Sequence, residues 1–106
     1  MVEQFLYLTT TGRVTGTARE IEIWFVEHDG KYYVLAEHRE KADWVKNIAR
    51  NPYVHVRVGP RALDAAARVL DVDKDRAVYQ IAQELMRKKY SWGSGLPVEI
   101  APYSTC

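Results

Sequence analysis

The sequence predicts a small, mainly β domain, built as an antiparallel barrel of six strands with two helices. Runs of alternating apolar residues fill most of the first two thirds of the chain. An Asp29-Gly30 pair between two such runs marks a tight hairpin. The resulting order, β-β-β-α-β-β-α-β, lacks the repeated strand-helix-strand units of a parallel sheet. With 106 residues, residues 1–106 are expected to form a single domain.

The first three strands are expected at Phe5–Thr10, Ala18–Val26 and Lys31–Ala36. The first of them combines aromatic, aliphatic and β-branched residues, the types that strands favour. In the second, every other residue from Ile21 onward is apolar, which indicates one buried face. The second and third strands flank the Asp29-Gly30 turn, so we expect them to pair antiparallel.

A short helix is expected to follow, because the apolar spacing changes at Lys41. The helix should end before Pro52, since a residue that precedes proline disfavours helical backbone. Tyr53–Val58 then alternates perfectly and should bury three valines in the core. The expected buried stripe of the helix consists of Ala42, Val45, Ile48 and Ala49.

The remaining third contains one ambiguous segment, one helix and one strand. Arg61–Leu70 alternates like a strand but contains three consecutive alanines, which favour a helix. We favour a strand that returns antiparallel to the valine strand. Asp73–Lys89 is expected to be a helix, acidic at its start and basic at its end, with Val78, Ile81, Ala82 and Leu85 as its apolar stripe. The final strand, Leu96–Ile100, contains Pro97 and is expected at a sheet edge.

Composition narrows the choice of partners and location. A net charge of +1 does not favour nucleic acid as a partner. No apolar run is long enough to span a membrane, so we expect a cytoplasmic protein without a membrane partner. The single cysteine, Cys106, has no evident base and is assigned no catalytic role. The three histidines have no metal-ligand spacing, and no metal site is predicted.

The segment Leu8–Arg19 has the composition of a phosphate-binding loop. Gly12 and Gly16 would allow backbone N–H groups to converge on an anion. The alternative is a polar hairpin turn with solvated arginines. The side chains of the loop that could donate to phosphate are those of Arg13, Thr15, Thr17 and Arg19.

Over most of its length the chain resembles the flavin-binding split β-barrels. These include pyridoxamine-phosphate-oxidase-like proteins and deazaflavin-dependent nitroreductases and quinone reductases. No single motif is specific to them, but the order and spacing of the matching segments are. The segments are Leu8–Arg13 with Gly16 and Arg19, Trp24–Val26, Asp43–Ile48 with Asn51 and Pro52, and Leu96–Pro102.

The resemblance implies a barrel of the FMN-binding split type and a cofactor site on it. FMN is the first choice of cofactor, because the short segment Ala36–Lys41 resembles the FMN branch and Val14 replaces a basic residue typical of the deazaflavin branch. The deazaflavin coenzyme is the alternative. The residues implied as cofactor-binding are Arg13, Thr15, Gly16, Arg19, Glu37, His38, Lys41, Trp44 and Asn47.

The implied activity is that of an oxidoreductase that passes a hydride to a small acceptor such as a quinone or nitro compound. A nicotinamide would serve as electron donor, and no catalytic side chain is assigned because the cofactor carries the chemistry. We expect a homodimer, since a domain of this size encloses little on its own. Two alternatives stay open: a flavin-binding module without turnover (a sensor, carrier or store), and a cofactor-free barrel that binds a protein or nucleic acid. Trp24 is expected to be structural, and Trp44 could be either structural or part of the site. The Ser and Gly residues around Trp92 suggest an exposed or mobile lid.

Overall fold

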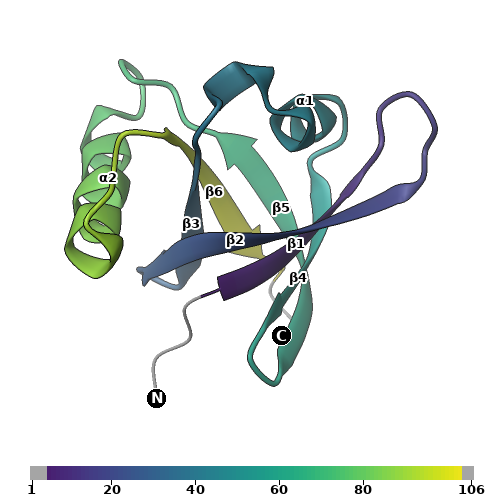
Figure 1. Ribbon diagram of the computed structural model, residues 1–106, viewed down its shortest axis with the longest axis horizontal. Coiled ribbons are helices and arrows are strands. Elements are labelled where there is room, and N and C mark those ends of the chain that lie inside the picture. Colours follow the sequence, from purple (N-terminus) through teal and green to yellow (C-terminus); the bar gives the residue numbers. More distant parts are fainter. Residues whose placement is uncertain (1–4, 104–106) are drawn as a thin grey trace.

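A computed structural model describes residues 5–103 as a closed antiparallel barrel (Figure 1). Around the barrel the strands follow the order β1-β2-β3-β6-β5-β4. This confirms the predicted six-stranded barrel and resolves the ambiguous segment as a strand. The strands are β1 (Phe5–Thr11), β2 (Ala18–His28), β3 (Lys31–Ala36), β4 (Tyr53–Val58), β5 (Arg61–Val69) and β6 (Leu96–Pro102).

The barrel interior is filled by the alternate residues of its strands. Val54, Val56 and Val58 of β4 are all buried, as the alternation predicted. Leu6 and Leu8 of β1 are fully buried and join them in one apolar cluster. A shift of any strand by one residue would turn its apolar side chains away from this interior. The alternation of period two therefore fixes the register of the barrel.

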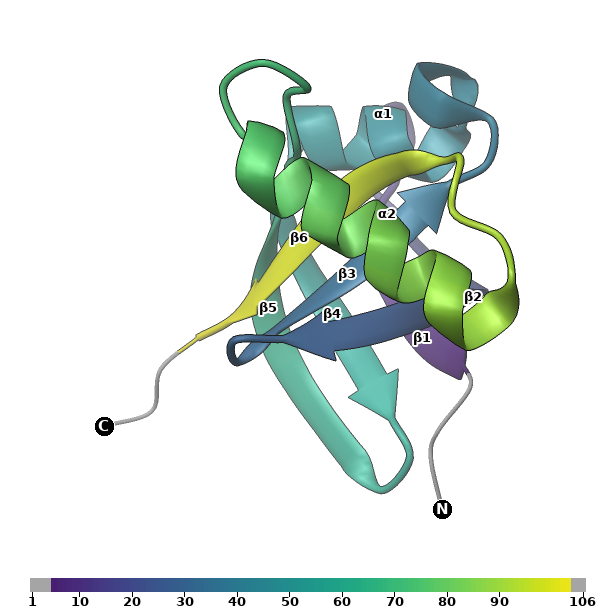
Figure 2. The same ribbon diagram turned by 90° about the vertical axis from the view of Figure 1, so that its left-hand side faces the viewer.

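Two helices and one 3-10 turn cover the barrel. The 3-10 turn Arg39–Lys41 precedes helix α1 (Asp43–Arg50), which covers one end of the barrel. Helix α2 (Arg76–Tyr90) crosses the outer face of β3 and β6 (Figure 2). Of the stripe expected for the first helix, Ala49 is exposed, and Asn47 is buried instead. The residues that α2 buries are Tyr79, Ala82 and Met86, whereas Val78, Ile81 and Leu85 are half-buried.

Strand β6 is not an edge strand, contrary to the sequence expectation. It pairs with β3 on one side and with β5 on the other. Pro97 is tolerated because the β5 pairing begins only at Val98, while the carbonyl of Pro97 accepts a hydrogen bond from the Leu70 N–H at 3.0 Å. The missing N–H of proline therefore interrupts neither ladder.

Strand β2 changes its partner halfway along. Residues Ala18–Trp24 pair with β1, and Phe25–His28 pair with β3. Within the described chain, the edge of Ala18–Trp24 that faces away from β1 consequently pairs with no strand. The same divergence lets the β1–β2 hairpin extend beyond the barrel (Figure 1).

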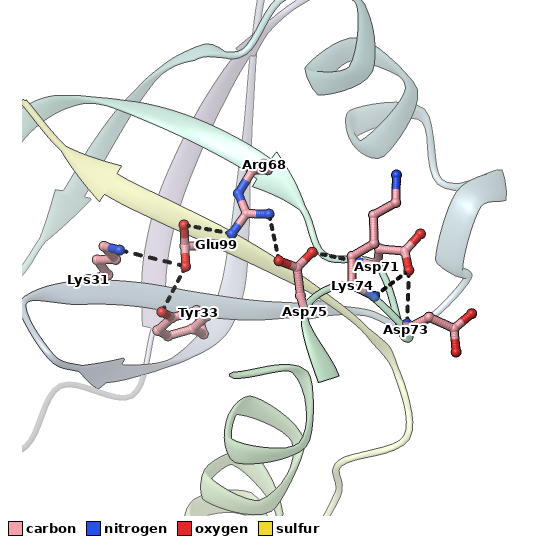
Figure 3. Close-up of polar contacts among 8 residues, drawn as sticks. All are labelled: Lys31, Tyr33, Arg68, Asp71, Asp73, Lys74, Asp75 and Glu99. Carbon is pink, nitrogen blue, oxygen red and sulfur yellow. Dashed lines mark hydrogen bonds and ion pairs between the residues drawn. The ribbon is translucent and has the colours of Figure 1, made fainter. Parts of the chain in front are cut away.

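The buried carboxylate of Glu99 joins three strands close to the start of α2 (Figure 3). Glu99 of β6 is 8% exposed and accepts hydrogen bonds from the Tyr33 hydroxyl at 3.0 Å and from Arg68 at 3.3 Å. Burial, and then the hydrogen bond to Glu99, raise the pKa of Tyr33 above its usual value. Lys31 lies 3.9 Å from the same carboxylate. The charge of Glu99 is thus compensated where it is buried.

The segment before α2 is a turn built by aspartates, which is why the helix starts at Arg76 and not at Asp73 as expected. Asp71 accepts the N–H groups of Asp73 and Lys74 at 2.8 and 2.9 Å, and Asp75 accepts the N–H of Asp71 at 2.8 Å. These hydrogen bonds lower the pKa of both Asp71 and Asp75. Asp75 also pairs with Arg68 at 2.9 Å, which joins the turn to the Glu99 network (Figure 3).

We predict that Asp75→Asn reduces the loss of stability in acid. A carboxyl with a lowered folded-state pKa stabilises the fold above its unfolded-state pKa, and this stability is lost as the pH falls through the folded-state pKa. The unfolding free energy of the variant, measured by urea titration, should therefore fall less between pH 6 and pH 3 than that of the parent. The matched control is Asp73→Asn, because the Asp73 carboxylate accepts no hydrogen bond from residues 5–103. Identical pH dependence in Asp75→Asn and the parent contradicts the account.

Candidate functional site

A groove runs along β2 from the hairpin loop to the end of α2. It consists of two adjoining cavities of about 450 and 570 Å³ that share Ile21 and Trp44. Most residues that line the first, which we call the polar cavity, are polar or charged, whereas most that line the second, the apolar cavity, are apolar. The first is lined by Gly12, Arg13, Val14, Thr15, Arg19, Glu20, Ile21, Asp43, Trp44 and Asn47. The second is lined by Phe5, Ile21, Glu22, Ile23, Trp24, Leu35, Glu37, His38, Trp44 and Trp92.

The hairpin loop at the polar end is shaped by its own hydrogen bonds. The Gly12 N–H donates to the Thr17 carbonyl and the Gly16 N–H to the Gly12 carbonyl, both at 2.8 Å. Gly16 has φ of +73°, a conformation that favours glycine. The turn itself therefore uses the N–H groups of Gly12 and Gly16, and neither is available to an anion. The expected convergence of other N–H groups of the loop on an anion stays a prediction. Gly16 shapes the loop and does not line the groove.

Asn47 fastens this loop to α1. Its side-chain oxygen accepts the backbone N–H of Arg13 at 3.2 Å and an Arg13 guanidinium N–H at 2.9 Å. Its amide nitrogen donates to the Thr10 hydroxyl at 3.2 Å. Asn47 is 4% exposed, so these partners replace water. The geometry gives Asn47 the role of holding the loop against the helix.

The two loop arginines differ in how they are engaged. Arg13 is tied to Asn47 and lies 3.5 Å from the carboxylate of Asp43, so part of its fork is already used. Arg19 is exposed and lines the polar cavity, and its side chain makes no hydrogen bond or ion pair with the described residues. Thr15 lines the cavity, with its hydroxyl 2.7 Å from that of Thr17. Arg19 is therefore the cation of this loop with its full set of donors available.

Two acidic residues of β2 also line the groove, but both have partners. Glu20 forms an ion pair with Arg57 at 3.4 Å. Glu22 accepts a hydrogen bond from the Tyr7 hydroxyl at 2.7 Å, which raises the pKa of Tyr7. Arg57 also lies over the Tyr7 ring, 4.3 Å from its centroid. These contacts offset the negative charge beside the arginines and make the polar cavity more favourable for an anion.

The apolar cavity has an aromatic wall. Trp24 stacks on Tyr90 with ring centroids 4.5 Å apart, and Trp92 meets Trp24 edge-on at 6.4 Å. The Tyr90 hydroxyl is anchored to the backbone of Phe25, donating to its carbonyl at 2.9 Å. Trp24 is 38% exposed and lines the groove, so it does not fill the core. Trp92 is half-buried instead of forming an exposed lid.

The segment after β3 forms the far rim of the groove. Glu37 and His38 are exposed and line the apolar cavity. Lys41 lies in the 3-10 turn and not at the start of α1, and it lines a third, adjoining cavity together with both of them. The residues implied by the resemblance thus gather around one groove, apart from Gly16 and from Lys41, which lines only the adjoining third cavity. Whether they hold a cofactor stays a prediction.

Sequence reasoning missed the apolar lining of the groove. Phe5, Ile21, Ile23 and Leu35 all contribute to it. The alternation of β2 had indicated that Ile21 and Ile23 face the core, but both are only half-buried because no strand covers that edge of β2. Phe5 is exposed and lies opposite Trp24 in the β1–β2 pairing. Its apolar side chain at the start of β1 is the one signal of this lining that the sequence pattern contained.

The two ends of the groove fit a ligand with a planar ring and an anionic tail. Aromatic faces bind planar rings by stacking, and free guanidinium groups bind phosphate or carboxylate oxygens. The start of α1 also lies at the polar cavity, where its dipole favours an anion. A deazaflavin or flavin nucleotide has both features, so the residues present fit such a group.

We predict that Asn47→Ala destabilises the protein by about 1–3 kcal/mol, because it leaves the buried Thr10 hydroxyl and the Arg13 N–H without their partner. Urea unfolding measures this loss. Lys46→Ala alters the exposed neighbour on the same helix and should stay within about 0.5 kcal/mol of the parent. Equal stabilities of the two variants would exclude the proposed role of Asn47.

Several solved structures share this fold, although the names of the proteins describe different functions. An F420-H2-dependent reductase, FDR-A, is 28% identical, with 92% of each chain covered and a TM-score of 0.67. A protein named as a pyridoxamine 5′-phosphate oxidase, from Listeria innocua, is 16% identical over 95% of this chain and 85% of its own (TM-score 0.74). The heme storage protein HutZ from Vibrio cholerae is 16% identical over 97% and 84% (TM-score 0.77). The last two show the fold alone.

No helix among residues 5–103 is both long enough and apolar enough to cross a membrane.

The family comparison is more specific than the structural ones, because it extends over nearly the whole chain. Residues 1–100 match the model of the F420H2-dependent quinone reductases. Together with the barrel, its groove and the likeness to FDR-A, this match shows that the chain belongs to the F420H2-dependent quinone reductase family.

Proposed function

We propose that this protein is a reductase that uses the reduced deazaflavin coenzyme F420H2 to reduce a quinone-type acceptor. One observation supports this most strongly: an arginine-bearing polar cavity and an aromatic cavity adjoin in a single groove, in a chain of this family. The arrangement suits a cofactor with a planar ring and a phosphate-bearing tail. The acceptor class follows the family name and is the part that an assay must establish.

This proposal changes two expectations drawn from the sequence. FMN was the first choice of cofactor, but the family match supports the deazaflavin and not FMN. A nicotinamide donor is likewise not supported, because F420H2 is itself the electron donor in this family. Of the two features that favoured FMN, the short segment after β3 forms the rim of the groove, and Val14 lines the polar cavity.

In this proposal the side chains bind and orient the coenzyme. Arg19 and Arg13 bind the anionic tail, while Trp44 lies at the junction where the tail meets the ring. Trp24, Ile21 and Ile23 provide an apolar surface that excludes water from the ring. When bound, the reduced deazaflavin supplies the hydride for the acceptor. No nucleophile or acid-base residue of the chain is required.

A turnover assay tests the proposal. Purified protein is mixed with F420H2 and a soluble quinone such as menadione, and the return of the oxidised deazaflavin absorbance is followed. We expect oxidation that depends on both protein and quinone, and none above background with NADH or NADPH as donor. Turnover with a nicotinamide but not with F420H2 contradicts the proposal.

We predict that Arg19→Ala weakens F420 binding by about 1.5–3 kcal/mol, the value of a charge-assisted hydrogen bond, without unfolding the barrel. The loss should appear as an increase of the dissociation constant in a fluorescence titration. Arg50→Ala is the control, since Arg50 is exposed and does not line the groove. If both variants bind F420 with the parental affinity, Arg19 does not belong to the site.

Binding without turnover is the second candidate function, because a storage protein shares this fold. The two are separated by the same assay: saturable binding of F420 without quinone-dependent oxidation supports a store or carrier. We also propose that the protein acts in the cytoplasm and as a homodimer, in which a second copy encloses the apolar cavity at the exposed Phe5 and Trp24 that line it. Sedimentation velocity tests the dimer, and a monomer at all concentrations excludes it.

A further inference from the structure

The backbone at Arg39 is unusual and has no local explanation. Its φ is +52°, in a region that residues other than glycine rarely adopt. Two other non-glycine residues of the described chain share this feature, and both occupy positions where it is common. Asp29 lies in the β2–β3 turn, and Ser91 caps the end of α2. Arg39 has neither reason, so its surroundings must hold it in this conformation.

The guanidinium of Arg39 binds two separate segments. It donates to the carbonyl of Ser94 at 2.7 Å and to the hydroxyl of Tyr79 at 3.3 Å. Ser94 belongs to the segment between α2 and β6, and Tyr79 is a buried residue of α2. A planar fork with several donors can hold two acceptors at a fixed spacing, which a lysine ammonium does less well.

The segment that contains Arg39 and the segment that it binds through Ser94 both carry residues that line the apolar cavity. Glu37 and His38 directly precede Arg39, and Trp92 lies two residues before Ser94. Gln83 of α2 also contacts the second of these segments, donating to the Gly95 carbonyl at 3.0 Å. A Cβ on Gly95 would lie 2.8 Å from both the Ala36 carbonyl oxygen and the Trp92 ring.

We propose that Arg39 is a positioning residue that holds residues 37–41 and Trp92–Gly95 at the spacing that the ring end of the groove requires. It acts through these two rim segments. The expected effect on ligand binding rests on the proposed function, since it concerns the ring of the deazaflavin. The expected effect on the spacing of the two rim segments does not rest on it, and it can be measured on the protein without any cofactor.

The first experiment uses protein labelled with 5-fluorotryptophan, whose three 19F resonances are assigned by Trp→Phe substitution. We expect Arg39→Gln to shift or broaden the Trp92 resonance and to leave Trp44 unchanged, with a thermal unfolding midpoint close to that of the parent. The change in the Trp92 resonance should be smaller in Arg39→Lys than in Arg39→Gln. Arg76→Gln is the control, because Arg76 is an exposed residue of the same helix as Tyr79.

The second experiment measures F420 binding and steady-state kinetics of the same variants. We expect Arg39→Gln to raise the dissociation constant of F420 or the KM of the acceptor about tenfold, while kcat changes less. An unchanged Trp92 resonance overturns the proposal, and so does a changed resonance with parental affinity and KM. If the parent binds no F420, the proposed function fails, and the Trp92 resonance still decides whether Arg39 holds the rim.

Discussion

The change of partner within β2 is the constraint on which the site depends. Up to Trp24 this strand pairs with β1, and from Phe25 it pairs with β3. If β2 kept both neighbours along its whole length, β3 would lie beside Ile21 and Ile23 and would leave less of them exposed. Because β3 diverges, these residues instead line a groove. The end of α2 stabilises the point of divergence, since Tyr90 and Lys89 both donate to the Phe25 carbonyl.

At the polar end of the groove, the contacts that stabilise the hairpin loop also occupy donors that could bind a ligand. Asn47 and Asp43 hold Arg13 in place, which orders the hairpin loop but uses part of the guanidinium. Arg19 has no such restraint among residues 5–103 and offers its full charge to a ligand. The carboxylate of Asp43 is 87% exposed, so rotating it toward solvent would release Arg13 at little cost. A bound phosphate and Asp43 therefore compete for one cation.

The sequence predicted the barrel well because its signals are local. The alternation in β4 and the Asp29-Gly30 turn determine the register without reference to distant residues. Errors arose where a distant partner decides the outcome. Pro97 indicated an edge strand, but the ladder with β5 begins only after it. At the glycine loop the reason is local: hydrogen bonds within the turn use the N–H groups of Gly12 and Gly16, which the composition of the loop did not reveal.

The candidate site could be predicted in part. The resemblance brought together Arg13, Arg19 and Trp44, which do line one groove. The aromatic wall could not be predicted, because the contact of Trp24 with Tyr90 joins residues 66 positions apart in the chain. The same holds for Arg39, whose partner Ser94 is 55 positions away. Such contacts follow from the packing of α2 and have no local pattern.

The most direct test of the central claim is an equilibrium titration of the cofactor-free protein with F420 and, separately, with FMN. Fluorescence of each cofactor reports its binding. The account predicts saturable binding of F420 that is at least about tenfold tighter than that of FMN, a difference of about 1.4 kcal/mol. Tighter binding of FMN, or no binding of either cofactor, would contradict it.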